Sequence, residues 1–177
     1  GEESYGFMIG DKVRDKDAIT SSLLAAEIAA SQKSRGSSFY EYLIESYMKF
    51  GLYHEELVSI KKEGKTGFEE IQKMMSDYRN NPPKSIAKIE IDKIDDYANQ
   101  ICLLSNGKKE KLPYPKSNLI GFTLVDGSKI AIRPSGTEPK IKFYFSVNTK
   151  LESIDAYPET KKILSSQCQK LIQSLGI

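Results

Sequence analysis

KIAIRPSGTEPKIKFYFSV, at residues 129–147, contains two runs of alternating residues on either side of a short polar segment. In the first run, Ile130 and Ile132 alternate with smaller or charged residues. A two-residue period is typical of a β-strand with one buried face. The stretch therefore predicts two strands joined by a loop. In the second strand every other residue is large and apolar: Ile141, Phe143, Phe145 and Val147.

The segment between the two runs carries groups that bind phosphate well. Arg133 offers a planar fork of N–H donors, and Ser135 and Thr137 offer hydroxyls that rotate freely. Gly136 lets the main chain come close to a ligand, and Lys140 adds a positive charge where the second strand begins. A proline on each side stiffens the segment, so a ligand has less entropy to remove. We therefore expect a phosphate site; the alternative is an ordinary polar turn, for which Pro, Ser and Gly are equally typical.

The overall composition restricts the class of protein. With 177 residues, the chain can form one good core or two small ones. A formal net charge of +2, without a face-sized excess of Lys and Arg, argues against nucleic-acid binding. No apolar run approaches the ~20 residues of a membrane span, and no signal-peptide pattern is present, so we expect no membrane association. Cys102 and Cys168 fit buried free thiols in a cytoplasmic protein rather than a disulfide framework or a metal site.

Capping signals predict two helices near the N-terminus. Asp17 can cap a helix that continues to about Lys33. Ser38 and Glu41 form a capping box for a second helix, which Gly51 ends. Apolar residues recur at helical spacing in the second helix, and we interpret them as core residues: Phe39, Tyr40, Leu43, Ile44, Tyr47 and Met48.

The rest of the chain alternates between strand and helix signals. Several antiparallel strands with helices covering one face give an α+β fold. We place a domain boundary so that residues 1–52 form one part and residues 53–177 the other. We predict a short strand at 57–62 and a helix from the capping box Thr66–Glu69 to 80–83. Strands follow at 86–91 and 119–125, with an irregular polar stretch at 92–117 between them and a two-residue turn at Asp126-Gly127 after them. A last helix follows Pro158, and its apolar side consists of Ile163, Leu164, Cys168, Leu171, Ile172 and Leu175.

His54 is the only histidine of the chain. A metal site or a catalytic dyad requires partners, and no cluster of Cys, Asp or Glu with ligand spacing surrounds His54 in the sequence. The sequence therefore predicts no metal site and no catalytic residue in this chain.

Two segments resemble one known family. Residues 133–140 resemble the phosphate-binding loop in the last domain of the α-D-phosphohexomutases, the family of phosphoglucomutases and phosphomannomutases. Residues 1–6, Gly-Glu-Glu-Ser-Tyr-Gly, resemble the sugar-binding loop of the third domain of that family. The two segments occur in the family's order and spacing, and the resemblance covers essentially the whole chain. Because Gly1 already lies inside a motif, we expect a C-terminal fragment of a longer polypeptide.

The resemblance implies that the chain contains parts of two domains with different binding residues. Residues 1–52 would be the helical end of the α/β third domain, and residues 53–177 the last domain, a TATA-box-binding-protein-like antiparallel sheet with helices on one face. Glu2 and Ser4 would bind sugar hydroxyls; the alternative is a frayed acidic tail. Lys12 and Arg14 would face the substrate phosphate; the alternative is a solvated loop. The phosphate itself would be bound by Arg133, Ser135, Gly136, Thr137 and Lys140.

The resemblance also implies an activity for the full-length protein. Family members move a phosphoryl group between sugar oxygens through a bisphosphate, using a phosphoserine and a Mg²⁺ held by an aspartate-rich loop in earlier domains. Neither a Thr-Ala-Ser-His-Asn-Pro-like nor an Asp-Gly-Asp-x-Asp-Arg-like stretch is present. We therefore expect an inactive piece that binds the phosphosugar and depends on the missing N-terminal domains. Mg²⁺ and glucose 1,6-bisphosphate would be cofactors of the whole enzyme only.

The preferred sugar is a further expectation. Residues 2–6 look most like phosphoglucomutases of a bacterial branch, whereas many phosphomannomutase-type relatives carry a histidine just after the sugar-loop serine, where this chain has Tyr5. Glucose phosphate is therefore the expected substrate. The alternatives are a phosphomannomutase, a phosphopentomutase, or a module that binds a phosphate ligand without catalysis.

Overall fold

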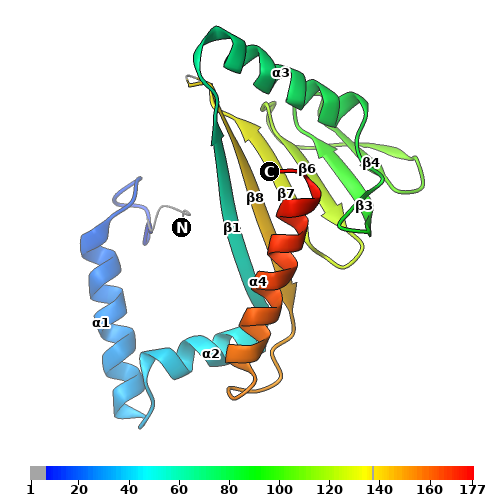
Figure 1. Ribbon diagram of the computed structural model, residues 1–177. Coiled ribbons are helices and arrows are strands. Elements are labelled where there is room, and N and C mark those ends of the chain that lie inside the picture. Colours follow the sequence, from blue (N-terminus) through cyan, green and yellow to red (C-terminus); the bar gives the residue numbers. More distant parts are fainter. Residues whose placement is uncertain (1–6, 137) are drawn as a thin grey trace.

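The computed structural model describes residues 7–136 and 138–177, apart from the side chain of Lys65. Figure 1 shows the elements in chain order. The helices are α1 (Ala18–Ser34), α2 (Phe39–Phe50), α3 (Gly64–Asn80) and α4 (Tyr157–Ser174). The strands are β1 (Leu52–Lys61), β2 (Ser85–Ile86), β3 (Ile89–Asp96), β4 (Ile101–Leu104), β5 (Lys109–Lys111), β6 (Ile120–Leu124), β7 (Lys129–Pro134) and β8 (Lys140–Thr149).

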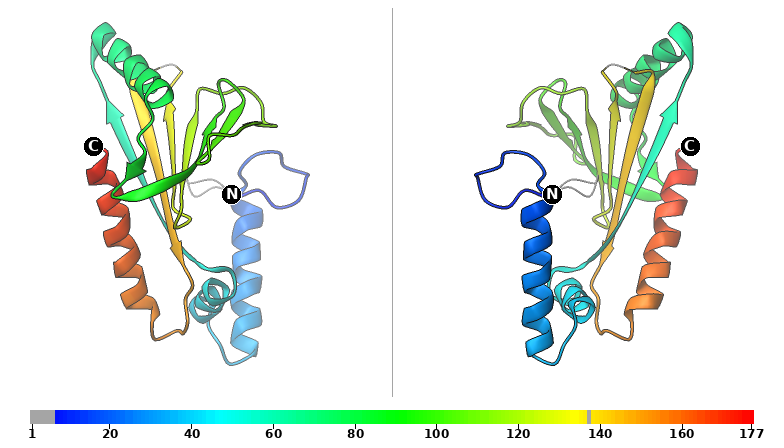
Figure 2. Two further views of the ribbon diagram at one scale, coloured as in Figure 1. Left: turned by 90° about the vertical axis from the view of Figure 1, so that its right-hand side faces the viewer. Right: turned by 90° about the vertical axis from the view of Figure 1, so that its left-hand side faces the viewer.

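The strands form one antiparallel eight-stranded sheet. Its order is β1-β8-β7-β6-β3-β4-β5, with β2 paired to β3 off this path. Helices α3 and α4 both pack on one face of the sheet, and α1 lies on the side of the opposite face (Figure 2). The predicted α+β class, with an antiparallel sheet and helices on one face, is confirmed. Among the described helices, none has the length and apolar character needed to cross a membrane.

The core lies between the sheet and these two helices. Both alternating runs of residues 129–147 form strands as predicted, and their apolar side chains face inward. Phe143 pairs with Ile132 across β7 and β8, and both side chains are fully buried. Ile71 of α3 and Leu164 of α4 close the core from the helix side. Cys102 and Cys168 are free and buried, as expected.

The capping signals near the N-terminus are confirmed. Asp17 Oδ1 accepts a hydrogen bond from the Ile19 N–H at 3.0 Å at the start of α1. The predicted capping box opens α2: Glu41 N–H donates to Ser38 Oγ at 3.1 Å, and Ser38 N–H donates to Glu41 Oε2 at 2.7 Å. These local bonds supply partners for backbone N–H groups that a helix leaves unpaired at its start.

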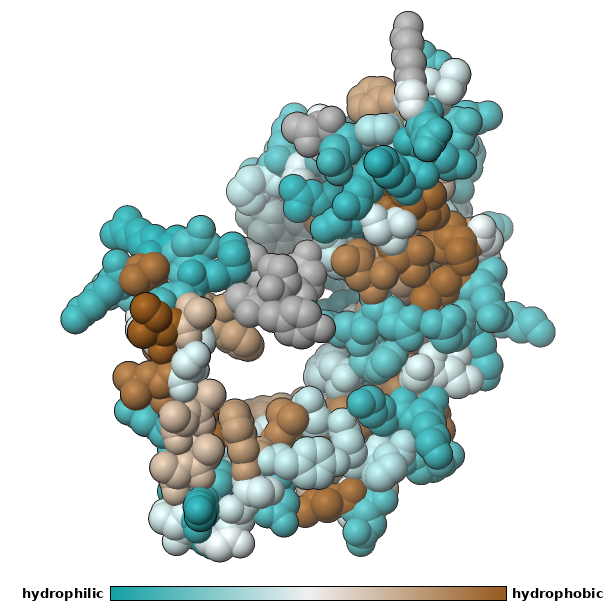
Figure 3. Space-filling model, turned by 60° about the vertical axis from the view of Figure 1, so that its left-hand side comes forward, coloured by the Kyte–Doolittle hydropathy of each residue, from teal (hydrophilic) through white to brown (hydrophobic). Residues whose placement is uncertain are grey.

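The interpretation of α2 as a core helix is correct for only one of its sides. Ile44 is fully buried, and the Tyr47 ring stacks on the Tyr157 ring of α4 at 5.9 Å. Phe39, Tyr40 and Leu43 are exposed, because only one side of α2 lies against β1 and α4. Figure 3 shows apolar side chains on the surface of this helical part of the molecule.

Two predictions around β1 are wrong. The strand begins at Leu52 rather than at residue 57, because it pairs with β8 along its full length. The capping box Thr66–Glu69 does not open α3, which begins at Gly64 with Glu63 as an N-cap that makes no side-chain hydrogen bond. A β-carbon on Gly67 would lie 2.6 Å from Lys62 Cβ. The glycine therefore lets the end of β1 pass close to the first turn of the helix.

Further corrections concern turns and edges. The strand expected at residues 86–91 is a tight hairpin, in which Ala87 and Lys88 both have positive φ between β2 and β3. The stretch 92–117 holds the rest of β3 together with β4 and β5 rather than irregular chain only. The turn at Asp126-Gly127 is present, but three residues separate Leu124 from Ser128, whose carbonyl accepts the Leu124 N–H. Ile163, expected in the core, is exposed.

Candidate functional site

The loop between β7 and β8 is held by its own hydrogen bonds. Ser135 N–H donates to the Lys140 carbonyl at 2.7 Å, and Lys140 N–H donates to the Glu138 carbonyl at 2.8 Å. Glu138 N–H donates to Ser135 Oγ at 3.3 Å. The Pro139 carbonyl accepts from Lys62 N–H, which ties the loop to the end of β1. The loop is therefore fixed to the sheet at both ends.

The strand register places cations side by side next to this loop. Arg133 lies directly opposite Lys142, and Lys140 lies opposite Lys61. Because residues alternate along a strand, Arg133, Lys140 and Lys142 all project from the face opposite to the core. A hollow of about 320 Å³ opens among them, and its lining residues are Arg133, Pro134, Ser135, Gly136, Glu138, Lys140, Lys142 and Tyr144.

The charge balance of this hollow is positive. Three cations line it against one carboxylate, that of Glu138. In the described part of the chain, no ion pair engages Arg133 or Lys140. The Lys142 ammonium lies 5.8 Å from the centre of the Tyr144 ring, which accepts a cation on its face. The arrangement can therefore receive an anion without first breaking a salt bridge of Arg133.

The backbone of the loop leaves room for a ligand. Among the described residues, apart from its chain neighbours, a β-carbon on Gly136 would meet no atom within 4 Å, so the space in front of this residue is open toward them. Because Gly136 has no side chain of its own, a phosphate oxygen can come close to its main chain. The polar turn considered as the alternative would not by itself place three cations around an open hollow.

The predicted site residues fall into three groups. Arg133, Ser135, Gly136 and Lys140 are brought together around the hollow. Lys12 and Arg14 lie in an exposed loop before α1 and do not line it. Thr137, Glu2 and Ser4 lie outside the described residues.

Sequence reasoning missed Lys142 and Tyr144. The signal was available, because a two-residue period that puts Lys140 on one face puts both of them on the same face. The register with β7, which brings Lys142 beside Arg133, could not be counted from the sequence of β8 alone.

A second cluster brings together residues that are far apart in the sequence. His54, Glu56 and Cys168 each offer a ligand atom, and these atoms all lie within 4.8 Å of one another. The interpretation that His54 has no partners with ligand chemistry is therefore wrong, because the fold brings Glu56 and Cys168 close to it. Burial, together with the nearby Glu56 carboxylate, raises the pKa of the Cys168 thiol to about 12.

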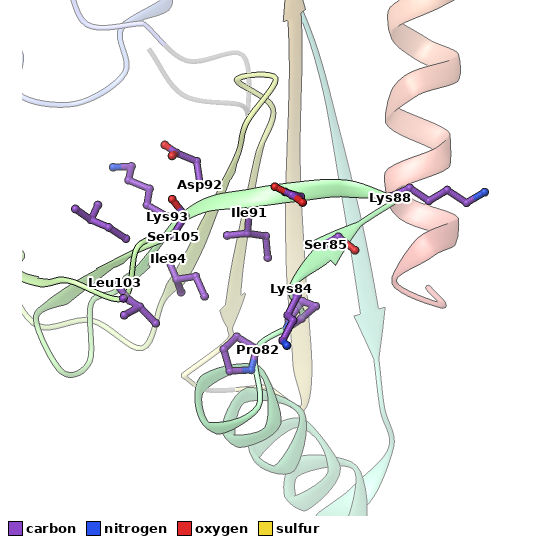
Figure 4. Close-up of a pocket in the computed structure, with 14 residues that line it drawn as sticks. Pro82, Lys84, Ser85, Lys88, Ile91, Asp92, Lys93, Ile94, Leu103 and Ser105 are labelled. Carbon is purple, nitrogen blue, oxygen red and sulfur yellow. The ribbon is translucent and has the colours of Figure 1, made fainter.

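A more voluminous hollow than the one beside Gly136 lies elsewhere on the described surface. It measures about 750 Å³ and lies between the turn that comes after α3 and the turn between β4 and β5. Its floor is apolar, with Ile91, Ile94 and Leu103. Figure 4 shows the charged ends of Lys88 and Lys93 on opposite sides, pointing away from each other. Because its polar groups do not converge, we do not regard it as the functional site.

Comparisons with known proteins agree on one family. A family model described as phosphoglucomutase/phosphomannomutase, alpha/beta/alpha domain III, matches residues 1–47. A phosphoglucomutase of Staphylococcus saprophyticus is 39% identical over 155 residues, which are 87% of this chain and 28% of the relative. A phosphoglucomutase of Staphylococcus aureus strain MRSA252 is 38% identical over 147 residues, 82% of this chain and 26% of the relative. The chain thus spans little more than a quarter of the length of these relatives.

A solved structure shares the fold. The open form of the exocytosis-sensitive phosphoprotein pp63/parafusin from Paramecium, described as a phosphoglucomutase, superimposes with a TM-score of 0.56. The match covers 97% of this chain and 30% of that chain at 20% sequence identity. The match of the domain III model ends at residue 47, and residues 48–177 follow it in the chain.

Proposed function

The chain belongs to the phosphoglucomutase/phosphomannomutase family, and from this premise we propose that it is the C-terminal part of a phosphoglucomutase. The whole enzyme interconverts glucose 1-phosphate and glucose 6-phosphate through a bisphosphate. This part binds the sugar and the phosphate that is not reacting. The observation that carries the proposal is the open hollow beside Gly136, lined by Arg133, Lys140 and Lys142.

Each of these groups has a defined task in the proposal. Arg133 grips two phosphate oxygens with its planar fork, and Lys140 and Lys142 act as point charges on the remaining ones. The hydroxyl of Ser135 and the main chain at Gly136 complete the set. Binding energy gained at this distant phosphate orients the sugar for transfer at its other end, which raises the rate of the chemical step.

Residues 7–136 and 138–177 do not supply the Mg²⁺ site that the family implies. Among the described residues, the group of His, Cys, Asp and Glu side chains close enough to hold an ion is His54, Glu56 and Cys168. Mg²⁺ prefers oxygen ligands, so nitrogen and sulfur donors do not fit it. We therefore assign no catalytic step to this chain and propose that phosphoryl transfer depends on domains that precede it.

The same proposal includes the domain division and the location. We assign residues 1–52 to the third domain and residues 53–177 to the last domain. The match of the domain III model to residues 1–47 supports this, as does the start of the sheet at Leu52. A cytoplasmic location agrees with the two free buried thiols.

Titration with a sugar phosphate tests the phosphate site directly. Glucose 6-phosphate is added to the chain while amide NMR shifts are followed, and we expect the largest changes around Gly136. Arg133→Ala should weaken binding about 10- to 100-fold, because a hydrogen bond between charged groups contributes about 1.5–3 kcal/mol. Lys129→Ala is the matched control, since Lys129 lies on the same strand and face but does not line the hollow.

Two outcomes would contradict the proposal. One is glucose 6-phosphate binding that is equally strong in the Arg133→Ala variant. The other is a set of shifts that cluster away from the β7–β8 loop. Competition among glucose 1-phosphate, mannose 1-phosphate and ribose 1-phosphate, measured on the intact enzyme, separates the glucose assignment from the mannose and pentose alternatives. An intact protein that binds these phosphosugars without converting them would favour the non-catalytic module.

A further inference from the structure

Two polar side chains lie on the core-facing side of β1. Inward positions of this strand alternate as Leu52, His54, Glu56, Val58 and Ile60. On β8, the residues paired with His54 and Glu56 are Val147 and Phe145, which are both buried and apolar. A histidine and a glutamate at such positions require polar partners, because burying an unpaired polar group is costly.

The partners come from α4. Cys168 is fully buried in the core, and its Sγ lies within 4.8 Å of ligand atoms of both His54 and Glu56. His54 Nε2 and Glu56 Oε1 are 2.9 Å apart. The three atoms thus lie close together where the edge strand of the sheet meets the helix that packs on it.

We propose that His54, Glu56 and Cys168 bind a Zn²⁺ ion. One imidazole nitrogen, one carboxylate oxygen and one thiolate sulfur match the ligand types of zinc sites, in which a water takes the fourth position. Tetrahedral zinc ligands lie about 3.3–3.7 Å apart, given metal–ligand distances of about 2.0–2.3 Å. To reach that spacing, side-chain rotation has to widen the 2.9 Å between His54 Nε2 and Glu56 Oε1 and bring the Cys168 sulfur, now within 4.8 Å, to the same distance. The thiol releases its proton to solvent as the zinc–sulfur bond forms.

Solvent can reach two of the three proposed ligands, and a neighbouring side chain orients one of them. The side chains of His54 and Glu56 are 21% and 24% exposed, so an ion and its water can enter from the edge of the sheet. Gln169 Nε2 donates to Glu56 Oε2 at 2.6 Å, which leaves Oε1 turned toward the histidine. Gln169 is therefore a positioning residue that orients a ligand without touching the ion.

The competing explanation is a purely structural network. In that case, the His54–Glu56–Gln169 hydrogen bonds satisfy the polar groups, and the thiol fills space as a small apolar side chain. The two explanations differ in whether the sulfur binds a metal, which can be measured.

Cobalt substitution tests the site on the 177-residue chain itself. The chain is stripped with a chelator and titrated with Co²⁺, which reports tetrahedral geometry through visible bands and sulfur ligation through a near-ultraviolet charge-transfer band. We expect one Co²⁺ per chain, a charge-transfer band, and displacement by Zn²⁺. Zn²⁺ should also raise the melting temperature, because it binds the folded state.

Variants assign the ligands. Cys168→Ser should abolish the charge-transfer band, while Cys102→Ser, which alters the other buried thiol, should leave it unchanged. His54→Gln changes a partly exposed residue and should also abolish tight binding. Gln169→Leu should keep the band but weaken the affinity about 10- to 100-fold. Circular dichroism of the metal-free variants confirms that each remains folded.

The proposal fails if the wild-type chain gives no charge-transfer band at stoichiometric Co²⁺. It fails equally if Cys168→Ser and His54→Gln both retain wild-type affinity, since the metal would then sit on unrelated surface groups. If Cys168→Ser does not fold, His54→Gln decides the question alone.

Discussion

The sheet part of the molecule and its N-terminal helical part are built in different ways. From Leu52 onward, nine apolar side chains of β6, β7 and β8 face a common core, which α3 and α4 cover. In residues 7–51, α1 leaves Ile19 82% exposed and Leu23 60% exposed, and its one buried residue is the polar Gln32. The sheet part is held by long-range packing, whereas α1 buries little apolar surface and has hydrogen-bonded caps at its ends.

The two parts meet at α2. α2 is shared, because Ile44 belongs to the core of the sheet while the opposite side of the same helix is exposed. Most helix stability in proteins comes from packing of an apolar face, and α1 leaves most of its apolar side chains exposed. The sheet part should therefore be stable as it stands, and α1 should depend on contacts that the described residues do not provide.

The largest difference in unfolding free energy between the two parts should come from truncating a core residue of the sheet part. Phe143 is fully buried, and its ring packs edge-on against the Tyr78 ring of α3 at 6.3 Å. Phe143→Ala should lower the free energy of unfolding by about 3–5 kcal/mol through lost burial and a new cavity. Leu23→Ala on α1 should change it by less than about 0.5 kcal/mol. Urea unfolding of both variants makes the comparison, and equal losses would contradict it.

The junction between the parts should show an intermediate effect. Gly51 ends α2 with φ 96° and ψ 149°, a backbone conformation that other residues rarely adopt. A β-carbon there would lie 3.4 Å from Tyr53 Cε2 and 3.7 Å from the Thr149 carbonyl oxygen. We expect Gly51→Ala to cost about 1–3 kcal/mol of unfolding free energy, measured in urea.

Gly136→Ala is the control for this junction. Apart from its chain neighbours, no described residue has an atom within 4 Å of a β-carbon added to Gly136, and the φ of Gly136 does not lie in the left-handed range. Its substitution should not lower the unfolding free energy. If both variants have the stability of the wild type, the strain assigned to the junction is absent.

The sequence predicted best where a local pattern coincides with a local physical cause. The alternation in residues 129–147 identified two central strands, and Asp17, Ser38 and Glu41 identified two helix starts. In each of these cases the residues that form the signal also make the stabilising contact. The four described residues that the phosphate-site prediction names also line a single hollow, because they lie close together in the chain.

The placements that the sequence did not predict depend on partners distant in the chain. The sequence of His54, Glu55 and Glu56 lacks the apolar alternation of a strand, yet all three pair with β8. The turn at Ala87-Lys88 has positive φ at both residues without the Gly or Asn that normally signals such a turn. Cys168 reaches His54 only because α4 packs on β1. None of these placements could be obtained from spacing along the chain.

Acidification should affect the helical part selectively, and this is the smallest of the expected effects. Hydrogen bonds from the Ser38 N–H and the Ser37 hydroxyl lower the pKa of Glu41, and bonds from Thr20 and Ile19 lower that of Asp17. A lowered pKa in the folded state means that the capping contribution is present at neutral pH and is lost as the pH falls below about 4, through the lowered values. Amide hydrogen exchange should therefore accelerate in the first turns of α1 and α2 before it does so in β7 and β8.

Glu41→Gln keeps an oxygen that accepts from Ser38 but does not titrate, so the first turn of α2 should lose its acid response while α1 retains it. An acid response that is uniform across helices and strands would mean that the caps are not what holds the N-terminal helices together.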